Sequence, residues 1–204
     1  SPLGAALFLD VPERGDIPLP LVWAKSAEGV GAGQAAESEQ DALHRCFYLA
    51  DLLSTWFALN AKIMSGPVAL AWEAPFLHPA AGLSNVRTYG TLMASVGVYT
   101  SMCDYAIKCR YLYPIRPQEA ATVYGGGNLK RAEKKIACQK WALAYWGEPG
   151  GRRIIDWQSE TGSIGHTKEQ IEAISDACSV GVKAIEQWRE SLLAAPAKAV
   201  RGRS

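Results

Sequence analysis

Val68-Ala-Leu-Ala-Trp-Glu73 is a short apolar run that ends in an acidic residue. A second stretch of the same kind, Ala5-Ala-Leu-Phe-Leu-Asp10, lies near the start of the chain. Apolar runs of this length, bounded by turn residues, are typical of buried β-strands. In open α/β sheets, ligand sites lie at the carboxyl ends of strands. The two acids are therefore the first candidates for a functional site.

The segments around these runs predict an alternation of strands and helices. Residues 38–64 carry apolar side chains three and four positions apart, which predicts a helix that Gly66 and Pro67 end. Further strands are expected at 19–23 and 111–115, and further helices at 84–106, 116–123, 130–146 and 167–193. This order predicts a single α/β domain over residues 1–204, with a Gly- and Pro-containing insert at about 147–165 and a flexible basic tail from about 196.

The composition excludes several classes of protein. With 204 residues, 49% of them hydrophobic and 20% charged, the chain is neither a disordered protein nor a small disulfide scaffold. It has no apolar run near the roughly 18–20 residues that span a bilayer, and no secretory signal, so no membrane partner is expected. The five cysteines are scattered, which predicts free, mostly buried thiols in a reducing intracellular compartment: the cytoplasm or, in a eukaryote, a DNA-containing organelle.

The charge is unevenly distributed along the chain. The formal net charge is +1, yet residues 1–107 hold 5 basic and 10 acidic side chains, and residues 108–204 hold 16 basic and 10 acidic ones. Residues 108–140 alone contain 8 basic side chains and 2 acidic ones. The basic segment is either a solvated helix face or a surface for a polyanion such as DNA.

Three acids lie among apolar residues: Asp10, Glu73 and Asp176. A carboxylate in such a setting tends to be partly buried, and a buried charge must be paired or must bind a metal. Oxygen ligands from several elements suit Mg²⁺ or Mn²⁺, and two such ions can cleave a phosphodiester by in-line attack of water. The alternative is that each acid is an ordinary cap or strand-end residue exposed to solvent.

The ordered set of motifs resembles the RuvC-type Holliday junction resolvases, which belong to the RNase H-like nucleases. The motifs are Leu7-Phe-Leu-Asp10, Trp72-Glu73-Ala-Pro-Phe76, Arg131-Ala-Glu-Lys134 and Asp176-Ala-Cys-Ser-Val-Gly-Val182. The resemblance covers most of the chain. It implies an RNase H-like α/β fold, in which helices flank a central mixed five-stranded sheet. It also implies a Mg²⁺-dependent endodeoxyribonuclease that acts as a homodimer on four-way DNA junctions.

The resemblance implies a role for individual residues in metal binding. Asp10, Glu73 and Asp176 would be catalytic and would hold two Mg²⁺ ions, for which Mn²⁺ would substitute. The family usually has two acids three residues apart in its last helix, whereas this chain has Ala173 three positions before Asp176. Glu172, about one helical turn before Asp176, is the nearest substitute for the fourth ligand. In the alternative register Asp176 is the first acid, and the second position holds no acid.

The remaining candidate residues concern DNA. Lys134 would contact the scissile phosphate or support the attacking water, unless it is an ordinary surface lysine. Lys130, Arg131 and Lys135 would bind backbone phosphates, which gives affinity without sequence information. Phe76 occupies the place of the family's aromatic residue that stacks at the junction centre; otherwise it anchors its own loop.

The leading hypothesis is therefore a resolvase that nicks a four-way junction symmetrically. A two-fold dimer suits this reaction, because it places two active sites on a two-fold substrate. Two alternatives stay open. One is an RNase H-like nuclease that acts on other branched or hybrid substrates, and the other is a catalytically inactive junction-binding protein, which the missing second acid in the last helix would explain.

Overall fold

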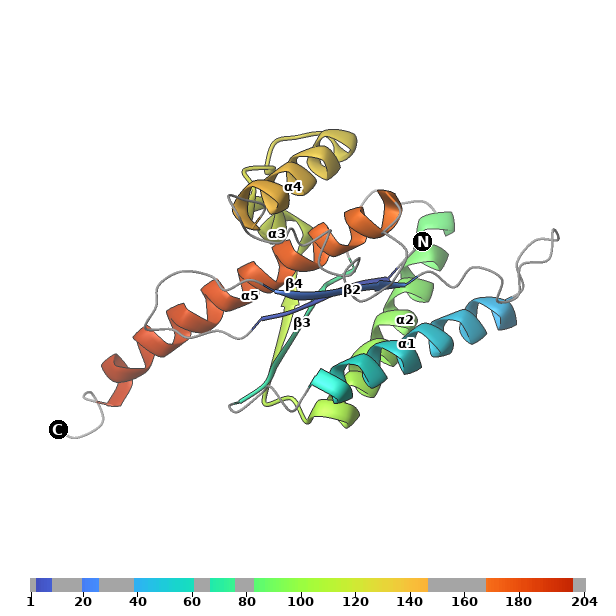
Figure 1. Ribbon diagram of the computed structural model, residues 1–204, viewed down its shortest axis with the longest axis horizontal. Coiled ribbons are helices and arrows are strands. Elements are labelled where there is room, and N and C mark those ends of the chain that lie inside the picture. Colours follow the sequence, from blue (N-terminus) through green and yellow to red (C-terminus); the bar gives the residue numbers. More distant parts are fainter. Residues whose placement is uncertain are drawn as a thin grey trace.

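The computed structural model describes residues 3–8, 20–25, 39–60, 67–75, 83–146 and 168–199 (Figure 1). Its elements, in chain order, are β1 (Leu3–Leu7), β2 (Leu21–Lys25), α1 (Glu39–Asn60), β3 (Ala69–Glu73), α2 (Leu83–Ile107), β4 (Tyr111–Ile115), α3 (Pro117–Val123), α4 (Arg131–Trp146) and α5 (Lys168–Ala199). The predicted order of strands and helices is confirmed. Because α5 extends to Ala199, the first residues of the expected tail are helical, while the expected insert at 147–165 lies outside the described residues.

The described strands form two small sheets. β1 pairs antiparallel with β2, with Leu3 opposite Lys25 and Leu7 opposite Leu21. β3 pairs parallel with β4, which requires the long crossover through α2. The chain is thus a mixed α/β protein, as predicted. Its described part contains two sheets of two strands each, which does not confirm the expected five-stranded sheet.

Helix α5 joins the two sheets, since it contacts all four strands and also packs against α3 and α4 (Figure 1). Small residues let it approach closely. A side-chain carbon added at Gly4 of β1 would collide with the backbone carbonyl of Ala173, and one added at Gly181 would collide with the Phe8 ring. β1 therefore runs alongside α5 in the same direction, from Ala173 towards Gly181.

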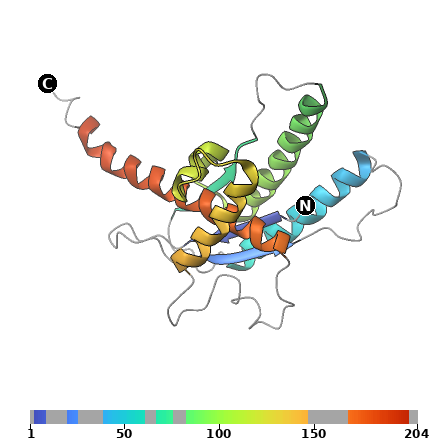
Figure 2. The ribbon, with the colours of Figure 1, turned by 90° about the horizontal axis from the view of Figure 1, so that it is seen from above.

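Helices α1 and α2 pack against each other and cover the strands on the side away from α5 (Figure 1). The core between them and the strands includes Trp23, Phe57, Leu70 and Cys103, all buried. On the far side of α5, α4 lies across the helix (Figure 2). The protein is thus layered, with helix α5 at the centre.

The cysteines confirm one expectation from the sequence. All five are free, and four of them (Cys46, Cys103, Cys138 and Cys178) are buried. Among the described helices, none is both long enough and apolar enough to cross a membrane.

Candidate functional site

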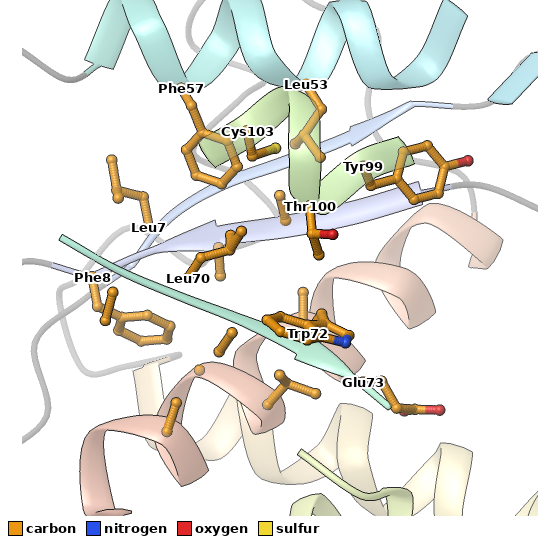
Figure 3. A pocket seen from close by; sticks show the side chains of 18 of the residues that line it. Leu7, Phe8, Leu53, Phe57, Leu70, Trp72, Glu73, Tyr99, Thr100 and Cys103 are labelled. Carbon is orange, nitrogen blue, oxygen red and sulfur yellow. The ribbon is translucent and has the colours of Figure 1, made fainter. Parts of the chain in front are cut away.

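Glu73 is the last residue of β3 and lies at the edge of an apolar cavity (Figure 3). The chain stays attached to β4 beyond it, because the Ala74 amide donates a hydrogen bond to the Ile115 carbonyl at 2.8 Å. Glu73 keeps an exposed side, yet desolvation by the surrounding protein raises the pKa of its carboxyl, and the charge of Asp176 raises it further. The strand-end acid therefore has a second acid beside it.

Asp176 lies on α5, on the part of the helix that faces the end of β3. Burial raises its pKa from the ordinary 3.8 to about 6, and the negative charge of Glu172 acts in the same direction. A hydrogen bond from the Cys138 thiol and the charge of Lys135 oppose this rise. Two of the three predicted catalytic acids, Glu73 and Asp176, are thus brought together by β3 and α5.

Glu172 lies about one turn before Asp176 and forms an ion pair with Lys135 of α4. We call Glu73, Glu172 and Asp176 the carboxylate site. The Glu172 side chain is 21% exposed and that of Lys135 is 45% exposed, so their ion pair lies at the outer edge of this site. The structure therefore places the predicted fourth ligand near Asp176, but with a lysine already bound to it. The predicted DNA-binding residue Lys135 is the lysine that makes this contact.

Two neutral groups that the sequence analysis did not single out lie behind the acids. The Cys138 thiol is 3.4 Å from the Ser175 carbonyl oxygen. Burial and the charge of Asp176 raise its pKa to about 12. Burial likewise raises the pKa of Tyr124 to about 12, with contributions from Cys138, Asp176 and Glu73. The spacing of Lys134 and Cys138 puts them on one face of α4, but nothing in the sequence says that this face packs against α5.

The other predicted basic residues lie at the start of α4. Lys130 immediately precedes the helix, and its amide donates a hydrogen bond to Oε2 of Glu133 at 2.8 Å. Lys130 and Arg131 are exposed, and Lys134 is half-buried in the first turn. This end of α4 is also the end that carries Lys135, so the basic residues lie on the same side of α5 as the ion pair.

Asp10 and Phe76 lie outside the described residues, so their predicted roles stay predictions. The strand that leads to Asp10 is described as far as Phe8, which packs beside Gly181, five residues or about 7.5 Å further along α5 than Asp176. β3 runs the other way along α5, with Ala71 packed in the cluster of Val180 and Glu73 beside Asp176. Figure 3 likewise shows Phe8 and Glu73 at opposite ends of the cavity.

The described end of β1 therefore lies beside a different part of α5 than the end of β3 does, and the expectation that both strands deliver their acids to one edge stays a prediction, because Asp10 lies outside the described residues. The physical reason for this difference in position is the close packing of Gly4 on Ala173. That contact places the first residues of β1, and not its last ones, beside the part of α5 that carries Asp176.

The cavity lies between the two sheets and has a volume of about 700 Å³. Consecutive residues of both β1 and β3 line it, together with apolar side chains of α1, α2 and α5. Glu73 and Asp176 also line it, so the two acids have apolar surroundings on one side. Desolvation by burial is the largest cause of the raised pKa of each acid.

The two carboxylates are better suited to binding a divalent cation than to carrying their charges without a counter-ion. Two carboxylates with raised pKa values gain stability when a cation neutralises them, and oxygen ligands of this type are those of Mg²⁺ and Mn²⁺. Within the described ranges, however, no three His, Cys, Asp or Glu side chains are grouped so that they could hold one metal ion together. A complete site would therefore need a ligand from elsewhere in the chain, or a rearranged Glu172.

Comparison of the chain with models of known protein families, with curated proteins and with solved structures gave no match.

Proposed function

We propose that the chain is a divalent-metal-dependent endodeoxyribonuclease of RNase H-like fold that cleaves branched DNA. The preferred substrate is a four-way junction, and the active form is a homodimer that nicks both sides. In this proposal Glu73 and Asp176 are metal ligands, with Asp10 and Glu172 completing the set. Two Mg²⁺ ions, for which Mn²⁺ can substitute, would supply an activated water and neutralise the leaving oxygen.

The observation that carries this proposal is the convergence of Glu73 and Asp176. The two residues lie 103 positions apart in the sequence, yet the charge of Asp176 raises the pKa of Glu73, and burial raises the pKa of both. A fold keeps two such carboxylates together only if something offsets their repulsion, and clusters with shifted pKa values are common at catalytic sites. The basic start of α4 lies beside them, where a phosphate backbone would pass.

The proposed fold is consistent with the two small sheets. An antiparallel pair, β1 with β2, and a parallel pair, β3 with β4, are the two kinds of pairing that a mixed sheet contains. Residues of both β1 and β3 line the cavity between the two sheets. We propose that these four strands are the described part of an RNase H-like sheet.

The decisive experiment is a cleavage assay on three synthetic substrates: a four-way junction, a flap and an RNA–DNA hybrid. We expect symmetric nicking of the junction with Mg²⁺ or Mn²⁺ and none with a chelator. Cleavage of the flap or the hybrid in preference to the junction would assign the chain to a different RNase H-like nuclease. Absence of metal-dependent cleavage on all three substrates would contradict the proposal.

The role of Asp10 can be tested in the same assay. Asp10→Asn should abolish cleavage and leave junction binding intact, because Asn has a similar shape but no charge. Exposed Glu186 of α5, which pairs with Lys183 at 3.0 Å, offers a matched control in Glu186→Gln. If Asp10→Asn still cleaves while Asp176→Asn does not, the site is built without Asp10.

A second candidate function is a catalytically inactive junction-binding protein. Two observations favour it: the ion pair that occupies Glu172, and the different positions of the ends of β1 and β3 along α5. Such a protein would keep the basic start of α4 and would bind a junction without cutting it. Gel shifts with the junction in the absence of any cleavage would support this candidate.

A further inference from the structure

Lys135 and Glu172 form a charge pair that joins α4 to α5. The pair links two helices that cross, so it does not arise from neighbouring positions on one helix, unlike the pair of Lys183 with Glu186. The Lys135 charge reaches beyond its partner, because it also acts on Asp176. A single lysine thus partly neutralises two of the proposed ligands.

We propose that Lys135 is the resident counter-ion of the carboxylate site and that a divalent cation displaces it from Glu172. Lys135 is a positioning residue in this scheme: it holds Glu172 near Asp176 while no metal is bound. The proposal rests on the proposed metal site and adds to it a competition between the ammonium group and the metal ion for one carboxylate.

The exposure of Lys135 favours exchange of its ammonium group over a permanent ion pair with Glu172. Lys135 is 45% exposed and sits on a flexible four-carbon chain, so its ammonium group can leave Glu172 and be solvated at little cost. Ion pairs with this degree of exposure contribute little to stability. A divalent cation between Glu172 and Asp176 would interact more strongly with both carboxylates than a half-exposed ammonium group does.

The test measures metal binding and not activity. Titration of the full chain with Mn²⁺ in the absence of DNA gives a dissociation constant, by calorimetry or by the spectroscopic signal of free Mn²⁺. Lys135→Met should tighten Mn²⁺ binding about threefold to fivefold, the range expected for loss of a competing half-exposed ion pair. Lys135→Arg keeps the charge and the pair, so its affinity should equal that of the wild type.

A double-mutant cycle separates exchange at Glu172 from a general effect of charge. If Lys135 acts mainly through Glu172, the effect of Lys135→Met must be clearly smaller in the Glu172→Gln background, where only its charge on Asp176 remains. Lys183→Met is the matched control, because it removes a lysine of the same type from an ion pair on α5. It should leave the Mn²⁺ affinity unchanged. Circular dichroism of each variant verifies the fold, and Lys135→Arg provides a variant that keeps the interaction.

The outcomes distinguish the two proposals. If the wild-type chain binds no Mn²⁺, the metal site itself is contradicted and the exchange falls with it. If the wild type binds Mn²⁺ and Lys135→Met binds it equally well, only the exchange is overturned. A gain in affinity that is undiminished with Glu172→Gln would also overturn it, since the lysine would then act only as a distant charge.

Discussion

The carboxylates at the starts of α3 and α4 differ from those of the carboxylate site in how the protein compensates their charge. At the helix starts, Oε2 of Glu119 accepts a hydrogen bond from the Arg116 amide, and Oε2 of Glu133 accepts one from the Lys130 amide, each at 2.8 Å. Both carboxylates satisfy backbone donors that a helix leaves unpaired. They stabilise the fold directly.

At the carboxylate site, burial raises the pKa of both Glu73 and Asp176, the charge of Asp176 raises that of Glu73 further, and the charge of Glu172 raises that of Asp176 further. Their arrangement therefore destabilises the metal-free chain when the acids are charged. The comparison teaches that position relative to backbone donors, and not residue type, separates structural acids from candidate functional ones. Each prediction below tests one side of this contrast.

The largest expected effect concerns catalysis. Glu73→Gln and Asp176→Asn should each lower the rate of metal-dependent junction cleavage about 10³-fold or more, since a lost ligand removes several kcal/mol of transition-state stabilisation. Single-turnover cleavage measures this loss. Glu119→Gln, at a helix start, should keep the wild-type rate, and an equal loss in that variant would erase the distinction between the two classes of acid.

The next effect concerns stability and its pH dependence. The native pKa of Asp176 is about 6 against an ordinary 3.8, so the folded state binds a proton more readily than the unfolded state between these values. Stability therefore falls as the pH rises through this window, by up to about 3 kcal/mol. Asp176→Asn removes this loss and should be more stable than the wild type at pH 7 and similar to it below pH 3.8.

Urea unfolding of both proteins across this pH range, with a chelator present, measures the difference. Glu73 contributes in the same direction, because its pKa is also raised. A wild type that is more stable than Asp176→Asn at pH 7 would show that the Asp176 charge is compensated in the native state.

The smallest expected effect is a loss of stability, whereas Asp176→Asn is expected to gain stability at pH 7. Glu119→Ala and Glu133→Ala should each destabilise the fold by about 0.5–1 kcal/mol at pH 7, because each leaves one amide at a helix start without its acceptor. Thermal unfolding detects a change of this size. If either variant is as stable as the wild type, water replaces the carboxylate at that helix start without loss.

Local patterns in the sequence predicted most of the elements. The apolar run that ends in Glu73, and the three- and four-residue spacing before Gly66, depend only on neighbouring residues, and the structure has a strand and a helix there. The candidate acids Glu73 and Asp176 were identified for the same reason, since each stands among apolar neighbours. That they lie together was an inference from the resemblance, and the structure brings them together.

The features that the sequence did not predict depend on long-range packing. Lys135 of α4 pairs with Glu172 of α5, and this contact depends on the packing of two helices that are separate in the sequence. The direction of β1 along α5 is set by the contact of Gly4 with Ala173, two residues that lie far apart in the chain. No periodicity in either segment contains this information.

The central place of α5 has a consequence for synthesis on the ribosome. Of the described elements, β1 is made before the others, but the helix that it packs against is made only after about 160 further residues, at roughly 5–20 residues per second. Until then neither sheet has a partner on that face, and the closure of so long a loop is slow. Glu73 consequently meets Asp176 late, so the two charges are brought together only in a chain whose remaining elements are already made.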